Sequence, residues 1–212
     1  MGINHYFSAD PEKRAKFIFN LIAPIYGRLD KYVESGFEKA KSILKENIDI
    51  KGTTVLDIGT GTGAWASVYS KAGAKKVTGV DFSEKMLAEA RKNHPNIDFF
   101  YSDAKNLTNI DDNQYEIVTS SFVLHGTKRA ERKKILSEME RVSRKYVVIH
   151  DFVGKTPIVI KILEWLERSD FVNFKRTFRD EMKDFFNHTF LFKVGKGTGI
   201  YVGVVEQRAE DK

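Results

Sequence analysis

The middle of this 212-residue chain alternates short apolar runs with segments whose apolar residues recur every three or four positions. The first pattern indicates buried β-strands, and the second indicates amphipathic helices. Strands are predicted at 54–58, 76–80, 97–101, 115–120 and 145–150, and helices at 63–71, 84–93 and 128–143. Strands that alternate with crossover helices are typical of an α/β fold with a parallel sheet.

The two ends of the chain have different patterns. Residues 8–48 are predicted to be helical, beginning at Asp10-Pro11, because an acid followed by proline is a helix-start signal. After Phe152, helices are predicted near 157–168 and 177–186, and strands at about 188–195 and 199–207. The glycines between these last strands predict a hairpin. We therefore expect a helical cap over the active site at 1–50 and a main domain at 51–212.

The most informative motif is Val-Leu-Asp-Ile-Gly-Thr-Gly-Thr-Gly at 55–63, where an apolar strand leads into three closely spaced glycines. Such glycines allow a ligand to approach the backbone where a strand gives way to a helix. The spacing differs from the dinucleotide fingerprint G-x-G-x-x-G, and no lysine follows Gly63 as a phosphate-binding P-loop requires. The carboxylate of Asp57 would repel a pyrophosphate, whereas it suits a ligand that carries an amino group or a sulfonium.

The following strands also end in polar residues that suit a nucleoside. Asp81 follows the second strand and is placed to accept both hydroxyls of a ribose, while Phe82 and Met86 are apolar candidates to flank an adenine ring. The candidates for adenine contact after the third strand are Ser102, Asp103 and Ala104. The fourth strand ends at Ser120, which is a further candidate for cofactor contact.

These motifs, in this order over residues 50–152, resemble the class I S-adenosylmethionine-dependent methyltransferases. The resemblance implies a Rossmann-like, doubly wound α/β sheet of seven strands, mostly parallel with a C-terminal antiparallel hairpin. It implies S-adenosyl-L-methionine as cofactor, an in-line methyl transfer, and no metal. The cofactor-binding residues that it implies, together with those argued above, are Asp57, Gly59, Thr60, Gly61, Gly63, Asp81, Phe82, Met86, Ser102, Asp103, Ala104 and Ser120.

A finer resemblance concerns residues 19–30, which read Phe-Asn-Leu-Ile-Ala-Pro-Ile-Tyr-Gly-Arg-Leu-Asp. This segment is similar to one in the ubiquinone/menaquinone-biosynthesis methyltransferases, of the methyltransferase domain 11/25 type. Gly27 and Asp30 depart from that group's pattern, as does the run that follows the fourth strand. A quinone is therefore one possible substrate among small molecules.

The candidate catalytic residues are His125, His150 and Tyr26. The two histidines follow the fourth and fifth strands, where a histidine can act as a base, and an adjacent acid, Asp151, can raise a histidine pKa. The alternative is that either histidine only caps a strand or bonds within the core. Tyr26, in the predicted helical cap, is a candidate for substrate or cofactor contact.

Composition limits the remaining possibilities. The absence of cysteine excludes disulfides and cysteine-based methyl transfer, and the lack of a secretion signal or an 18-residue apolar run favours a cytoplasmic protein without a transmembrane segment. Of the net charge of +6, residues 128–145 carry +5, from eight basic residues against three glutamates. This segment is either a solvated helix face or a surface that attracts an anionic partner.

We therefore expect a small-molecule methyltransferase, a monomer or a homodimer, without a strong nucleic-acid signal. The alternatives are an RNA- or protein-modifying methyltransferase that uses the basic 128–145 segment, and a non-catalytic binding protein with this fold.

Overall fold

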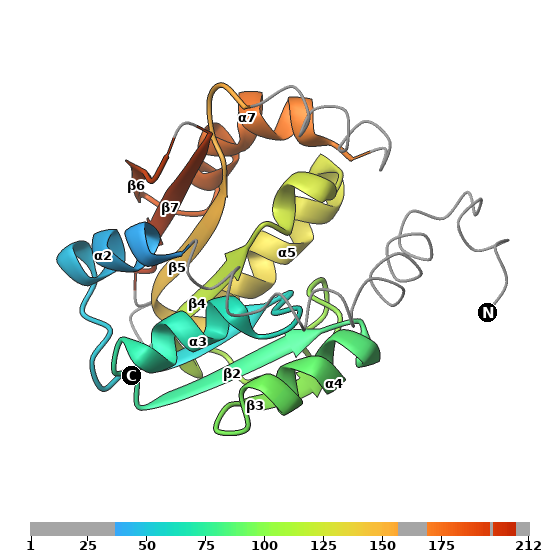
Figure 1. The fold of residues 1–212 in the computed structure, drawn as a ribbon. Helices are drawn as coiled ribbons and strands as arrows, with labels where there is room; N and C mark the ends of the chain where they lie inside the picture. Colours follow the sequence, from blue (N-terminus) through green and yellow to red (C-terminus); the bar gives the residue numbers. More distant parts are fainter. Residues whose placement is uncertain (1–36, 157–168, 196, 207–212) are drawn as a thin grey trace, which may run out of the picture.

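The computed structural model describes residues 37–156, 169–195 and 197–206, which form a seven-stranded sheet with helices on both faces (Figure 1). The strands are β1 (Thr54–Ile58), β2 (Lys76–Asp81), β3 (Asp98–Tyr101), β4 (Tyr115–Ser121), β5 (Ser143–Phe152), β6 (His188–Lys193) and β7 (Thr198–Val204). Their order in the sheet is β3-β2-β1-β4-β5-β7-β6. The first five are parallel, whereas β7 runs antiparallel to both β5 and β6. The expected α/β sheet with a C-terminal antiparallel hairpin is confirmed.

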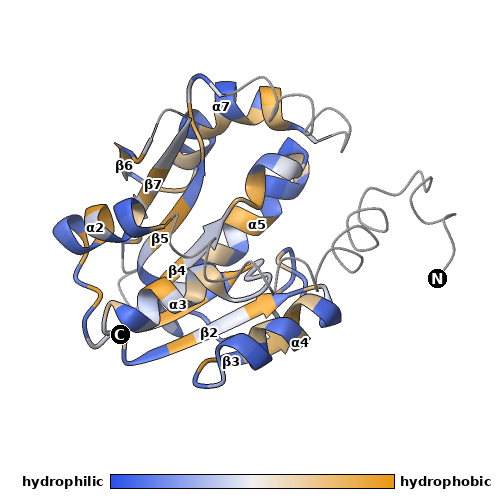
Figure 2. Ribbon diagram, viewed as in Figure 1, coloured by the Kyte–Doolittle hydropathy of each residue, from blue (hydrophilic) through white to orange (hydrophobic). Residues whose placement is uncertain are grey.

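The helices bury their apolar stripes in two separate cores, one on each face of the sheet. The described helices are α2 (Glu38–Asn47), α3 (Ala64–Lys71), α4 (Glu84–Asn93), the short 3₁₀ helix η2 (Leu124–Gly126), α5 (Arg129–Val142) and α7 (Phe171–Lys183). One core holds buried residues of α2, α3 and α4, and the other holds those of α5 and α7. Figure 2 shows the corresponding alternation of apolar and hydrophilic residues along the helices.

The strand order reverses direction between β1 and β4, and this reversal determines where a ligand can bind. The chain moves outward from β1 to β2 and β3, then returns to place β4 on the other side of β1. In open α/β sheets the carboxyl ends of such neighbouring strands form the ligand crevice. The Ser120 hydroxyl, near the end of β4, donates to the carbonyl oxygen of Ile58 at 2.8 Å and so ties the two strand ends together.

The predicted elements of the middle region agree with the structure to within about two residues at nearly every boundary. The helix predicted at 177–186 was placed wrongly, because α7 begins at Phe171 and ends at Lys183. Its buried residues Phe171, Phe174, Phe178 and Met182 recur at three- and four-residue spacing, which defines the true start of the helix. The helices predicted before residue 37 and near 157–168 lie outside the described residues.

Within the described ranges, we find no helix that is both long enough and apolar enough to cross a membrane.

The strand pairing at the C-terminal edge is fixed by close packing. Gly203 of β7 lies under the ring of Phe186, and a Cβ added at Gly203 would come within 2.4 Å of two ring carbons. Phe186 is buried in the same core as α5 and α7, so its ring has little room to move.

We therefore expect Gly203→Ala to destabilise the fold by about 1–3 kcal/mol, because an added methyl forces a buried ring out of its place. Chemical denaturation with fluorescence detection measures this. Gly195→Ala is the matched control, since its added Cβ would lie 3.6 Å from the nearest atom, Oγ1 of Thr198. Equal stability of the two variants would contradict the packing argument.

Candidate functional site

The glycine loop after β1 lies at the strand reversal, with Gly59 and Gly61 partly exposed and the residues between and after them buried. Gly59, Gly61 and Gly63 all have positive φ angles, of 68°, 56° and 88°. A Cβ at Gly61 would meet no atom of the described residues within 4 Å. A Cβ at Gly63 would lie 2.8 Å from a His94 ring atom and 2.9 Å from a Phe99 ring atom. Gly61 therefore leaves room for a ligand, whereas Gly63 is also required by the packing of α3 and β3.

Asp57, near the end of β1, is a fully buried carboxylate without a cationic partner in the described part of the chain. Its side chain has no exposed surface. Oδ2 accepts a hydrogen bond from the Thr60 hydroxyl at 2.7 Å, and Oδ1 has no hydrogen-bond partner among the described residues. Burial raises the pKa of Asp57 to about 8, and the nearby Asp81 carboxylate adds to this shift. The site therefore favours a ligand that brings positive charge to Asp57.

Asp81 ends β2 and fastens the glycine loop to the start of α4. Its Oδ2 accepts from the Gly61 amide at 2.9 Å, and its Oδ1 accepts from the Ser83 amide at 2.8 Å. Burial raises the pKa of Asp81, although these backbone hydrogen bonds favour its ionised form. A carboxylate has about four acceptor positions, so Asp81 can also accept from ligand hydroxyls.

The remaining predicted cofactor residues lie in different surroundings. Phe82 is partly exposed, whereas Met86 is buried on the first turn of α4. Asp103 begins a turn, because its Oδ1 accepts from the Lys105 amide at 2.9 Å. Ser102 and Ala104, on either side of it, are partly buried. Ser120 is fully buried. Tyr26 lies outside the described residues, as does most of the predicted N-terminal cap.

The two candidate histidines lie on opposite faces of the sheet. Neighbouring residues of a strand point to opposite faces, so His150 and Asp151 cannot share one environment. His125 of η2 forms the pair with Asp151: Nδ1 lies 2.8 Å from Oδ1, and the His125 amide donates to Oδ2 at 3.3 Å. Asp151 raises the pKa of its sequence neighbour His150, as expected, but burial outweighs this effect and lowers the pKa to about 4.

His150 occupies an apolar, aromatic environment on the α2–α3 face. Its ring stacks on Trp65, with centroids 5.0 Å apart, and lies edge-on to Phe37 and Phe122. Nδ1 lies 3.2 Å from the Ser121 hydroxyl, and within the described ranges the buried Nε2 has no hydrogen-bond partner. This histidine is neutral at pH 7.

Phe122 separates the two histidines and has a strained backbone. Its φ of 54° is unusual for a large side chain, and such strain costs about 1–3 kcal/mol and clusters at functional sites. Its ring centroid lies 4.8 Å from that of His150 and 6.5 Å from that of His125. Its amide donates to the His150 carbonyl oxygen at 2.9 Å.

Three more phenylalanines surround His125 on the other face. The rings of Phe152, Phe171 and Phe174 lie edge-on to its imidazole, with centroids at 4.8, 6.2 and 6.3 Å. Neither these three phenylalanines nor Trp65 were predicted as site residues. Phe171 and Phe174 belong to the apolar stripe of α7, which is a signal in the sequence, whereas Phe152 ends β5 and Trp65 lies on α3.

The basic 128–145 segment is largely neutralised by neighbouring acids. Seven of its eight cations, all but Lys128, form ion pairs within 4.0 Å. Arg132 is buried and pairs with Glu181 and Asp170, and Arg141 pairs with Glu138 and Asp112. This pairing lowers the local field available to attract an anionic partner.

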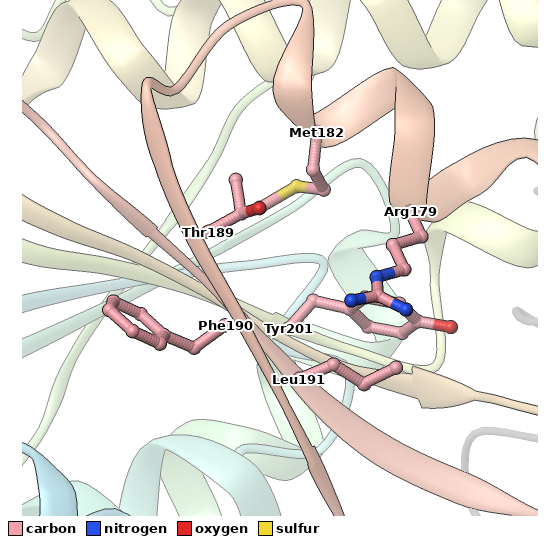
Figure 3. A pocket seen from close by; sticks show the side chains of 6 residues that line it. All are labelled: Arg179, Met182, Thr189, Phe190, Leu191 and Tyr201. Carbon is pink, nitrogen blue, oxygen red and sulfur yellow. The ribbon is translucent and has the colours of Figure 1, made fainter.

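A small pocket lies apart from this site, at the β6 edge of the sheet. It is lined by Arg179, Met182, Thr189, Phe190, Leu191 and Tyr201 (Figure 3). Tyr201 donates from its hydroxyl to the Phe152 carbonyl oxygen at 3.0 Å, and burial raises its pKa. The pocket is formed by α7, β6 and β7, and β6 is four strands from β1, so it does not belong to the glycine-loop site.

Sequence comparisons agree with this geometry. Residues 55–145 match the family model described as a methyltransferase domain. The demethylmenaquinone methyltransferase of Paenarthrobacter aurescens is 35% identical over 129 residues, which are 60% of this chain and 49% of that protein. The demethylmenaquinone methyltransferase of Chlorobaculum tepidum is 34% identical over 111 residues, which are 50% and 46% of the two chains. The chain thus spans about half the length of these curated relatives.

The fold is shared with solved methyltransferases. The magnesium protoporphyrin IX methyltransferase of Synechocystis, solved with bound SAM, superposes with a TM-score of 0.68 at 19% identity. The superposition covers 94% of this chain and 99% of that one. The fold and the match over residues 55–145 resemble the class I S-adenosylmethionine-dependent methyltransferases. The two sequence relatives named above are demethylmenaquinone methyltransferases, so both expected resemblances are confirmed.

The residues present fit the cofactor of this class, S-adenosylmethionine. The orphaned Oδ1 of Asp57 needs a positively charged partner, and the open backbone at Gly61 leaves room beside it. The free acceptor capacity of Asp81 suits ribose hydroxyls. The buried, unpaired oxygen of Asp57 costs the unliganded protein stability, as is common at functional sites.

We therefore expect Asp57→Asn to stabilise the unliganded protein, because the amide can be buried without taking up a proton. The folded-state pKa of about 8 is far above the ordinary aspartate pKa of 3.8, so wild-type stability falls as pH rises between those values. The gain in melting temperature should grow from pH 5 to pH 8, while stabilisation by S-adenosylmethionine is lost. Thermal unfolding with and without cofactor measures both effects.

The matched control is Asp49→Asn, which replaces an exposed carboxylate. This control should keep the stabilisation by cofactor and the pH dependence of the wild type. A parallel pH dependence for Asp57→Asn and the wild type would show that burial of Asp57 has no such cost.

Proposed function

We propose that this protein transfers a methyl group from S-adenosylmethionine to a small molecule with an apolar ring, using His125 as the general base. The observation that carries this proposal is the His125–Asp151 pair, which lies within a wall of aromatic rings at the strand ends of a methyltransferase domain. S-adenosylmethionine supplies an electrophilic methyl group on a sulfonium.

The chain divides the cofactor among three strand ends. Asp57 and the backbone at Gly61 would hold the positively charged methionine end. Asp81 would accept the ribose hydroxyls, and Phe82 and Met86 would flank the adenine, with Asp103 nearby. Alignment of reactants by such contacts supplies about 7–11 kcal/mol of rate enhancement.

His125 is the better base of the two histidines. Asp151 is fully buried, contacts Nδ1 of His125, and is held in place by the Phe152 amide at 2.7 Å. A carboxylate in this position orients the imidazole and stabilises its protonated form. In contrast, the pKa of His150 is about 4, so His150 is a weak base near neutral pH. Transfer of a substrate hydroxyl proton to His125 would make an oxygen or ring carbon nucleophilic as the methyl group leaves sulfur.

The acceptor class follows from the walls of the site and from the sequence relatives. Phe122, Phe152 and Phe171 present ring edges and faces beside the base, which suits a flat apolar substrate. The matched relatives are demethylmenaquinone methyltransferases, so a quinol-type acceptor is the first to test. Neutralisation of the basic 128–145 segment supports this choice over RNA or protein.

We expect His125→Ala to lower methyl transfer by about 10²–10⁴-fold, the usual contribution of a positioned base, without changing cofactor affinity. Transfer of a labelled methyl group to a panel of quinols and other phenolic metabolites measures the rate. His188→Ala, at a side chain that is 70% exposed, is the matched control. If His125→Ala keeps full turnover, His125 is not the base, and the protein accelerates the reaction only by aligning the cofactor with the acceptor.

We expect Asp81→Ala to weaken binding of S-adenosylmethionine by about tenfold to a hundredfold, because hydrogen bonds to a carboxylate are lost. Isothermal titration calorimetry measures the affinity. Asp98→Ala removes an acid that is 72% exposed at the start of β3 and should have no effect. Absence of cofactor binding by the wild-type protein would refute the proposed function as a whole.

A further inference from the structure

The most deeply buried cation in the described part of the chain is Arg132 of α5, which has no exposed side-chain surface. Its Nε and Nη2 donate to the two carboxylate oxygens of Glu181, at 2.9 and 3.0 Å. Its Nη1 donates to Oδ2 of Asp170 at 2.8 Å and to the carbonyl oxygen of Thr127. Burying an arginine together with two carboxylates carries a large desolvation cost, so a buried arginine of this kind indicates a specific structural role.

The partners of Arg132 belong to the segments that enclose His125. Thr127 directly follows η2, the single turn that carries His125. Asp170 directly precedes Phe171, the first residue of α7. Glu181 lies on the last part of α7 and also accepts from the Thr177 hydroxyl at 2.6 Å. One guanidinium therefore joins the end of η2 to both ends of α7.

The same arginine also contacts the aromatic wall itself. Its Cζ atom lies 5.5 Å above the ring of Phe174, whose centroid is 6.3 Å from that of His125. Phe171 contacts both Phe152 and His125. A displacement of α7 relative to η2 would therefore move these rings against the imidazole.

We propose that Arg132 is a positioning residue that sets the orientation of His125 by fixing η2 against α7. The proposal rests on the proposed role of His125 as base. The planar, multi-donor guanidinium holds three acceptors from two segments at once, which a lysine ammonium or an apolar side chain cannot reproduce. Asp151 holds the imidazole from β5, and Arg132 holds the loop that carries it.

Arg141 provides a matched control on the same helix. It also binds a carboxylate through two nitrogens, Glu138 at 2.8 and 2.9 Å, and reaches the carbonyl oxygens of Leu107 and Ile110. These partners lie in the connection between β3 and β4 and on α5 itself, away from η2 and α7. Loss of Arg141 therefore tests the general effect of removing a bound arginine from α5.

The principal variant is the double substitution Arg132→Met with Glu181→Leu, which avoids leaving a buried carboxylate unpaired. We expect it to bind S-adenosylmethionine within about twofold of wild type, and to lower kcat by about 100-fold, the effect of roughly 1 Å of misplacement. The imidazole ¹⁵N resonances of His125, assigned by comparison with His125→Ala, should shift. Arg141→Met should leave both kcat and these resonances unchanged.

If the double variant does not fold, Asp170→Asn is the second test, because it weakens only the link from Arg132 to the start of α7. Asp170→Asn should shift the His125 resonances less than the double substitution would. Unchanged His125 resonances in a folded double variant, or in Asp170→Asn where the double variant is unfolded, would overturn the proposal. If these resonances shift but His125→Ala keeps full turnover, Arg132 still positions His125. In that case the proposal that His125 is the general base is refuted.

Discussion

The burial of Asp57 at the strand reversal is the constraint on which the rest of the site depends. Within the described residues this carboxylate lacks solvent, a cation and a partner for Oδ1, so it is costly to ionise, and its pKa of about 8 expresses that cost. The fold tolerates it because β1 and β4 are tied through Ser120 and because Asp81 anchors the adjoining loop through Gly61. A positively charged ligand would relieve this cost, which supports the proposed binding of a sulfonium cofactor at Asp57.

The second half of the site is organised by the alternation of β5. Because His150 and Asp151 point to opposite faces, the acid serves His125 of η2 and the neighbouring histidine enters an aromatic environment of low polarity. The two imidazoles therefore have different properties, although they follow adjacent strands and looked equivalent as candidates. Phe122 lies between them and has a strained backbone. Such strain persists only where the surrounding structure holds the residue in that conformation.

The proposed acceptor side differs from the proposed cofactor side in how it is built. The cofactor side depends on short-range backbone geometry after β1 and β2, whereas the acceptor side depends on α5, α7 and η2, which meet through Arg132. The family model covers residues 55–145, which include η2 and α5, and ends before α7. The charges of the 128–145 segment belong to this second assembly, where they join α5 to α7 and to the sheet rather than forming an open basic surface.

The sequence alone determined the order of strands and helices, the glycine loop with Asp57, and the class of cofactor, because these depend on local periodicity and on motifs within a few residues. The helix α7 was misplaced by sequence reasoning, since its start is set by an apolar stripe that packs on the distant β5 and η2. Only the tertiary structure could assign Asp151 to His125, lower the pKa of His150, and gather Thr127, Asp170 and Glu181 around Arg132. Those relations join residues as many as 49 positions apart, and burial and contact between such positions exist only once the chain has folded.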